Sequence, residues 1–222
     1  MIGPLVDVTW VTDHLPLIWA RFIQHLELTA IPVVAGFAIS LVVAILVRRR
    51  QTAYAVVIGI TGVLYTIPSL AAYVVVARIT GLTLLTAVTP LVTYTLLILV
   101  RANVAGLRAV PPEVLEAAQG MGYTGRQRLL RVELPLAIPL MMAGIRLATV
   151  TTIGLATVAA IIGGESFGGF GQFLTEGLQR FFSTEIYLGA VLSVLFAIVA
   201  DVLLVRVERW ATPWARSRAG VA

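Results

Sequence analysis

The chain has 222 residues, of which 59% are hydrophobic and only 12% are charged, and its mean hydropathy is +0.97. This composition excludes an ordinary soluble domain and indicates a protein that crosses a membrane several times. The formal net charge of +5 does not indicate nucleic-acid binding, because the arginines cluster at the ends of apolar runs and in one connecting segment.

The first 26 residues mix apolar, polar and charged side chains. Trp10, Trp19 and nearby acidic residues predict a segment that lies along the membrane interface on the outer side, and it lacks the basic start and small-residue cleavage site of a signal peptide. His14 and His25 stand without any cysteine or acidic cluster of metal-ligand spacing. We therefore expect no metal site and no catalytic residue in this chain.

Three long apolar runs follow. Residues 28–47 are long enough to span the hydrocarbon and end at the triple arginine 48–50. Residues 53–77 form a second predicted span, which contains Pro68, and residues 82–100 form a third, which contains Pro90. Proline and glycine inside such spans loosen the helix or allow close packing of backbones.

Residues 101–134 form a polar connecting segment that we expect in the cytoplasm. Pro112 suits the first position of a short helix, Glu113 suits its positive end, and Gly122 can take the left-handed conformation that ends it. Thr124 and Gln127 have the spacing of a capping box, which predicts a second short helix that ends before Pro135. Two short helices at a membrane surface indicate a site where another protein docks.

The same segment resembles the EAA motif of bacterial ABC-importer permeases, E-A-A-x3-G-x9-I-x-L-P, with Val132 in place of isoleucine. In that family the segment is the coupling helix that fits a groove on the ATPase subunit. The resemblance therefore implies ATPase-coupling roles for the motif residues and their apolar neighbour, namely Glu116, Ala117, Ala118, Met121, Gly122, Leu134 and Pro135.

A fourth span is predicted from Leu136 to about Ile162, followed by a glycine-rich loop and a polar stretch, and a fifth over residues 187–205. If the triple arginine is cytoplasmic, that side holds twelve arginines and the other side only Arg21, Arg78 and Arg180. This bias predicts an outer N-terminus and a cytoplasmic C-terminus. The expected organisation is an interfacial segment 1–26, a five-span domain 27–207 and a basic tail 208–222.

Two charges fall inside predicted spans. Arg146 lies in the fourth span and Asp201 in the fifth. An isolated charge near the bilayer centre costs about 2.5–3.5 kcal/mol on insertion scales, and pairing would relieve both costs. We therefore hypothesise an Arg146–Asp201 contact. In the alternative, Asp201 lies near the membrane interface, and Arg146 reaches the interface or donates to backbone carbonyls.

Stretches beyond the EAA motif resemble the osmoprotectant branch of these permeases. They include residues 25–29, Thr66 to Leu70, and residues 149–164. The resemblance implies an all-α polytopic membrane protein with the MetI-like fold of type I ABC importers, and import of glycine betaine, carnitine or choline. Six residues are candidates for the translocation pathway: Thr66, Pro68, Ser69, Thr93, Tyr94 and Thr152.

The chain contains no phosphate-binding loop of the form G-x-x-x-x-G-K-[ST], so ATP and magnesium are expected on a separate ATPase. The expected partners are a second permease chain, identical or paralogous, two ATPase subunits, an extracytoplasmic solute-binding protein and the lipid bilayer, with no nucleic acid. One alternative keeps this architecture but carries methionine or another amino acid. A second is a self-sufficient secondary transporter, for which Asp201 is the candidate ion-coupling carboxylate.

Overall fold

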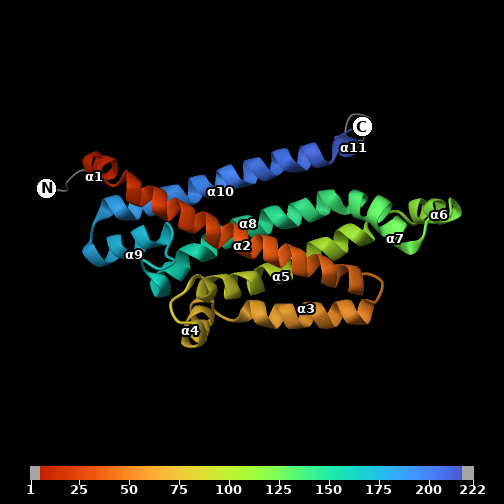
Figure 1. The fold of residues 1–222 in the computed structure, drawn as a ribbon, viewed down its shortest axis with the longest axis horizontal. Helices are drawn as coiled ribbons and strands as arrows, with labels where there is room; N and C mark the ends of the chain where they lie inside the picture. The colour runs from red at the N-terminus through yellow and green to blue at the C-terminus, as the bar shows by residue number, and fades with distance from the viewer. Residues whose placement is uncertain (1–5, 217–222) are drawn as a thin grey trace.

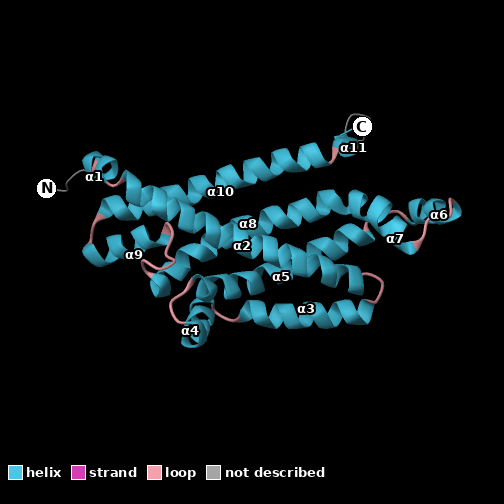
Figure 2. Ribbon diagram, in the orientation of Figure 1, coloured by secondary structure: helices cyan, strands magenta, loops and turns pink. Residues whose placement is uncertain are grey.

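A computed structural model describes residues 6–216 of the chain, and within that range every regular element is a helix (Figures 1 and 2). Four helices are long and apolar enough to cross a membrane: α2 (Leu15–Val47), α5 (Leu84–Arg108), α8 (Leu134–Gly163) with the turns that precede it, and α10 (Ser183–Ala211). A bent pair, α3 (Gln51–Thr66) and α4 (Ser69–Thr80), supplies a fifth crossing if it counts as one span. The predicted all-α membrane fold is confirmed.

The second span is broken, which the sequence prediction of one helix over residues 53–77 did not anticipate. α3 and α4 meet at an angle of 90°. The break lies at Ile67 and Pro68, where Ile67 has the extended conformation (φ −64°, ψ 126°). A residue before proline is pushed out of the helical region, and proline offers no N–H to continue the ladder, so these two residues end α3.

The other spans are longer than predicted. α2 begins at Leu15, so much of the segment 1–26 belongs to the first long helix, after the short α1 (Val8–Asp13). α5 continues to Arg108, eight residues past the predicted end at Val100. α10 extends from Ser183 to Ala211, and the last short helix is α11 (Pro213–Arg216). The polar stretch before α10 contains a helix, α9 (Gly171–Arg180).

The molecule has two distinct ends, visible in Figure 1. At one end lie α1, α4 and α9. At the other end α6 (Pro112–Gly120) and α7 (Gly125–Arg128) project beyond the long helices. The triple arginine 48–50 and the end of α5 lie on the α6 side, so the unequal distribution of arginine follows the long axis of the bundle.

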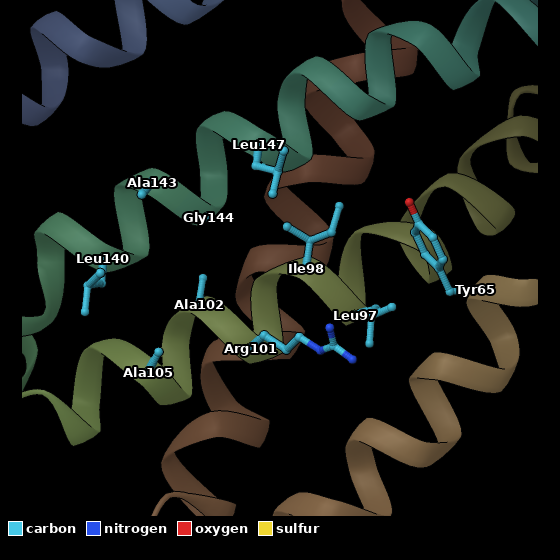
Figure 3. Close-up of a pocket in the computed structure, with 10 residues that line it drawn as sticks. All are labelled: Tyr65, Leu97, Ile98, Arg101, Ala102, Ala105, Leu140, Ala143, Gly144 and Leu147. Carbon is cyan, nitrogen blue, oxygen red and sulfur yellow. The ribbon is translucent and has the colours of Figure 1, made fainter.

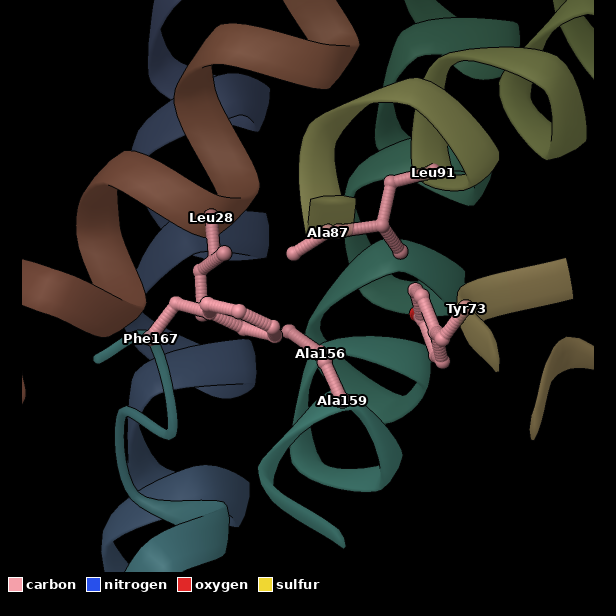
Figure 4. Close-up of a cluster of buried hydrophobic side chains, with 7 residues drawn as sticks. All are labelled: Leu28, Tyr73, Ala87, Leu91, Ala156, Ala159 and Phe167. Atoms are coloured by element: carbon pink, nitrogen blue, oxygen red, sulfur yellow. The ribbon is translucent and has the colours of Figure 1, made fainter. Parts of the chain in front are cut away.

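Two buried clusters hold the long helices together. One joins α2, α4, α5, α8 and the loop after α8 through Leu28, Tyr73, Ala87, Leu91, Ala156, Ala159 and Phe167 (Figure 4). The other lies nearer to α6 and surrounds Ala44, Val100, Val104 and Ala137. A polar pair lies between α2 and α5, where Asn103 Nδ2 donates to Ser40 Oγ over 2.9 Å. Small residues in both clusters let the helix backbones approach closely.

Candidate coupling and pathway site

α6 has the boundaries that its sequence predicts. Pro112 occupies its first position, and Gly122 has a φ of +80° just beyond its end. The Tyr123 N–H donates to the Ala118 carbonyl over 3.1 Å, and the Gly122 N–H donates to the Gln119 carbonyl over 2.9 Å. The bond from Tyr123, across a residue in the left-handed region, is the mark of a Schellman cap. Glycine at 122 therefore stops the helix with its last carbonyls satisfied.

One face of α6 is open to a partner. Ala118 is the buried member of the motif, with 1% of its surface exposed, and it anchors the helix to the rest of the chain. Glu116 and Ala117 are exposed, and Met121 is 68% exposed at the tip. At 100° per residue, Val114, Ala118 and Met121 share one side of α6. The structure divides that side, because Ala118 packs inward while Met121 points outward.

The chain then turns back toward the membrane through α7. Thr124 and Gln127 form the predicted capping box: the Gln127 N–H donates to Thr124 Oγ1 over 3.3 Å, and the Thr124 N–H donates to Gln127 Oε1 over 2.9 Å. A π-helical turn, Leu129–Glu133, leads into α8. Leu134 and Pro135 are the first residues of α8, so these two motif residues form the joint between the coupling segment and the span.

Glu133 ties this joint to the end of α2, a role that the sequence analysis missed. Its side chain is only 4% exposed and faces three arginines. Arg48 Nε lies 3.0 Å from Glu133 Oε2, Arg128 Nε lies 3.1 Å from Oε1, and Arg49 lies 3.6 Å from Oε1. A buried carboxylate needs such partners. The signal available in the sequence was a single acid next to Leu134 in a segment otherwise rich in arginine.

The candidate pathway residues gather at the break between α3 and α4. Thr66 is the last residue of α3 and Pro68 lies in the break itself, both of them exposed, and Ser69 begins α4. The Tyr94 hydroxyl on α5 donates to the Ile67 carbonyl over 2.7 Å, which satisfies an acceptor that the break frees. Thr93 and Tyr94 also line a cavity of about 210 Å³ between α3, α4 and α5.

The threonine hydroxyls bond locally. Thr66, Thr93 and Thr152 donate to the carbonyls of Val63, Thr89 and Ala148 within their own helices. Thr152 is 1% exposed within the packed part of α8. It therefore lies within the helix packing of this chain. The pathway roles of Thr66, Thr93 and Thr152 stay predictions.

The structure brings Arg146 and Asp201 together. Arg146 Nε donates to Asp201 Oδ1 over 2.8 Å, and Nη2 donates to Oδ2 over 3.1 Å. Glu208, about two turns further along α10, lies 3.6 Å from Nη1 of the same guanidinium. The bidentate geometry joins α8 to α10 and satisfies both charges within the protein.

No group of three or more histidine, cysteine or acidic side chains within residues 6–216 could hold a metal ion. His14 stacks on Trp10 at a centroid distance of 4.2 Å, and His25 stacks on Phe170 at 4.9 Å. His25 Nδ1 accepts a hydrogen bond from the Phe170 N–H over 3.3 Å, so this side chain fastens the loop after α8 to α2.

Residues 36–216 match the protein family described as "Binding-protein-dependent transport system inner membrane component". The chain belongs to this family. The permease is therefore a translocation component in the inner membrane, and ATP hydrolysis takes place on a separate chain of such a transporter. An ATPase and a solute-binding protein are the partners that this kind of transporter requires.

Two proteins similar to this permease are named as osmoprotectant permeases. The permease is 35% identical over 190 residues to the glycine betaine/carnitine/choline transport system permease protein OpuCB of Bacillus subtilis (strain 168), with 86% of each chain covered. It is 34% identical over 211 residues to the osmoprotectant import permease protein OsmW of Salmonella typhimurium, with 93% of this chain and 97% of the relative covered. Among solved structures, a chain of the inward-facing MetNI methionine ABC transporter superposes with a TM-score of 0.76 and 25% identity, over 89% of this chain and 98% of that one.

Proposed function

We propose that this permease imports quaternary ammonium osmoprotectants, such as glycine betaine, carnitine or choline, and that α6 receives the motion of a partner ATPase. The coupling part of the proposal depends on α6, whose capped end and exposed Glu116, Ala117 and Met121 project beyond the bundle (Figure 1). The solute class is supported by the relatives, which are similar along nearly the whole chain.

The coupling mechanism follows from the connections of α6. Ala118 holds the helix to the chain, and Glu133 links the following turn to Arg48 at the end of α2 and to Arg128 in α7. A displacement of α6 is therefore transmitted to α8 through Leu134 and to α2 through Glu133. No covalent chemistry on this chain is required. ATP and magnesium act on the partner, and alternating access results from rigid helices that move as a group.

We propose an orientation with α6 in the cytoplasm, the N-terminal side outside, and two permease chains assembled with two ATPase subunits. The concentration of arginine at the α6 end supports this orientation. The chain contains no cysteine, so single cysteines can report sidedness directly. An impermeant thiol reagent added outside cells should label Leu178→Cys on α9 and leave Met121→Cys unlabelled until the membrane is opened. The reverse pattern would refute the orientation.

The solute class is tested by reconstituting the permease with its ATPase and solute-binding protein in proteoliposomes. We expect glycine betaine, carnitine or choline to stimulate both ATP hydrolysis and uptake. Methionine is the matched alternative, because the solved relative belongs to a methionine transporter. Stimulation by methionine and by none of the three osmoprotectants would refute the proposed solute class and leave the coupling role intact.

A self-sufficient secondary transporter is disfavoured by the state of Asp201. Both of its carboxylate oxygens accept hydrogen bonds from Arg146. An ion-coupling carboxylate has to exchange its partner for a proton or a sodium ion, and this one is already neutralised by a guanidinium in a bidentate pair.

A further inference from the structure

A groove between α3, α5 and α8 contains one charged side chain that the coupling mechanism does not use (Figure 3). Its volume is about 550 Å³, within the range of roughly 300–1,000 Å³ that is usual for small-molecule sites. Arg101 is the charged residue, and Tyr65 closes one side. The remaining lining is aliphatic: Leu97, Ile98, Ala102, Ala105, Leu140, Ala143, Gly144 and Leu147.

Arg101 lies within the long helix and not in the connecting segment. α5 continues seven residues beyond it to Arg108, so Arg101 lies about 10 Å inside the helix end at 1.5 Å per residue. Within residues 6–216 no carboxylate approaches its guanidinium to within 4.0 Å, whereas Arg48 and Arg146 each have a carboxylate partner. An unpaired cation within a membrane-spanning helix is unfavourable against lipid tails, which favours water on this face of α5.

Tyr65 provides a different kind of surface on the same groove. Its ring stands edge-to-face on the ring of Tyr94, with 5.7 Å between centroids and planes at 88°. Tyr94 is itself held by its hydrogen bond to the Ile67 carbonyl, so the pair is fixed at the end of α3. Figure 3 shows the Arg101 side chain extending from α5 in the direction of Leu97 and Tyr65. A positive group and an aromatic ring therefore face the same space.

The floor of the groove is rigid because α5 and α8 touch there. A Cβ added to Gly144 would lie 2.2 Å from Ala102 Cβ, so the two helices are in van der Waals contact at that level. Ala105 and Ala143 on either side of the contact have short side chains that leave the volume open. Packing of small residues fixes the separation of Arg101 from the α8 wall.

We propose that this groove is a pathway subsite for zwitterionic solutes, in which Arg101 binds the carboxylate and the Tyr65 ring contacts the quaternary ammonium group. The inference depends on the proposed function and adds to it a preference for solutes that carry both charges over choline. Guanidinium groups bind carboxylates with charge-assisted hydrogen bonds, and aromatic faces attract quaternary ammonium groups. Choline has the ammonium group but no carboxylate, so Arg101 repels it and offers it no compensating bond.

Uptake by the reconstituted transporter tests separately how Arg101 binds the carboxylate and how Tyr65 contacts the ammonium group. Arg101→Gln should reduce glycine betaine and carnitine uptake about tenfold or more, the scale of one lost charge-assisted bond. Choline uptake should stay level or rise, because the repulsion is removed. Tyr65→Leu should reduce the uptake of all three solutes, while Tyr65→Phe, which keeps the ring, should not. Arg78→Gln, an exposed arginine at the other end of the bundle, is the matched control.

Solute protection of a single cysteine locates the subsite without depending on uptake. Ala105→Cys in this cysteine-free chain should react with a charged thiol reagent, and glycine betaine should slow that reaction. The slowing should disappear in the double variant Arg101→Gln/Ala105→Cys. Val199→Cys, on the apolar exposed face of α10, should stay unreactive throughout.

The outcomes distinguish this inference from the proposed function. A wild-type transporter that no osmoprotectant stimulates refutes the function itself. A wild-type transporter that carries choline alone, or an Arg101→Gln variant that loses betaine and choline uptake equally, overturns the subsite and leaves the function standing. An Ala105→Cys variant that glycine betaine does not protect also overturns it.

Discussion

The Glu133 carboxylate and the Arg48 guanidinium form a buried ion pair with 3.0 Å between Oε2 and Nε. Arg48 is the residue just after α2, and Glu133 is the residue just before α8. The pair therefore connects the first span to the joint where the coupling segment enters the fourth. Because Arg128 of α7 shares the same carboxylate, three separate elements meet at one side chain.

We predict that Glu133→Gln destabilises the folded permease by about 3–5 kcal/mol, the usual cost of leaving buried charges unpaired. The transporter should also lose coupling between ATP hydrolysis and uptake, because α2 no longer follows the coupling segment. Thermal unfolding of the purified transporter measures the first effect, and uptake per ATP hydrolysed measures the second. Glu27→Gln, at an exposed position on α2, is the control. Equal stability of the two variants would contradict the structural role.

Gly122→Ala should uncouple the transporter with little loss of fold. Residue 122 has a φ of +80°, and an alanine there is strained by roughly 1–2 kcal/mol. The strain distorts the end of α6, where Met121 is exposed. Solute-stimulated ATP hydrolysis and co-purification of the ATPase should both fall. Gly120→Ala, two residues earlier and helical, has no atom near its added Cβ and should behave as wild type.

For the ion-pair network between α8 and α10, we predict which of two substitutions lowers the amount of transporter in the membrane more. Arg146→Gln leaves both Asp201 and Glu208 without their partner, whereas Asp201→Asn leaves Arg146 beside Glu208. Arg146→Gln should therefore lower the amount of transporter in the membrane more than Asp201→Asn does. A simple exchange of Arg146 and Asp201 should rescue poorly, because it places an acid near Glu208. Adding Glu208→Gln should improve the rescue, and an exchange that rescues fully without it would contradict the three-residue arrangement.

Gly144→Ala should destabilise the permease by about 1–3 kcal/mol, because the new methyl group would lie 2.2 Å from Ala102 Cβ and force α5 and α8 apart. Gly154→Ala is the matched control on the same helix, with no atom within 4 Å of its added Cβ. A lower midpoint of thermal unfolding for the first variant alone is the expected result. Equal midpoints would show that the helices separate at little cost.

The sequence predicted the parts of this fold that local chemistry determines. Pro112 and Gly122 mark the ends of α6, and the capping box of Thr124 lies where it was expected, because helix ends depend on residues close in the chain. The break at Pro68 was missed, because the hydropathy of residues 53–77 is continuous across it. The contacts of Glu133 were missed for a different reason. They depend on which charges from distant segments come close, and spacing along one chain does not specify that.

The 90° break at Pro68 also sets how the permease sits in lipid. α3 has 16 residues and is about 24 Å long at 1.5 Å per residue, while the hydrocarbon layer is about 30 Å thick. The shortfall lies at the α4 end of α3, where α4 runs at 90° to α3 and exposes apolar side chains such as Val75 and Ile79. Bilayers with longer acyl chains should therefore strain this one edge of the protein. Acyl-chain length should then alter the movement of the permease helices independently of the solute.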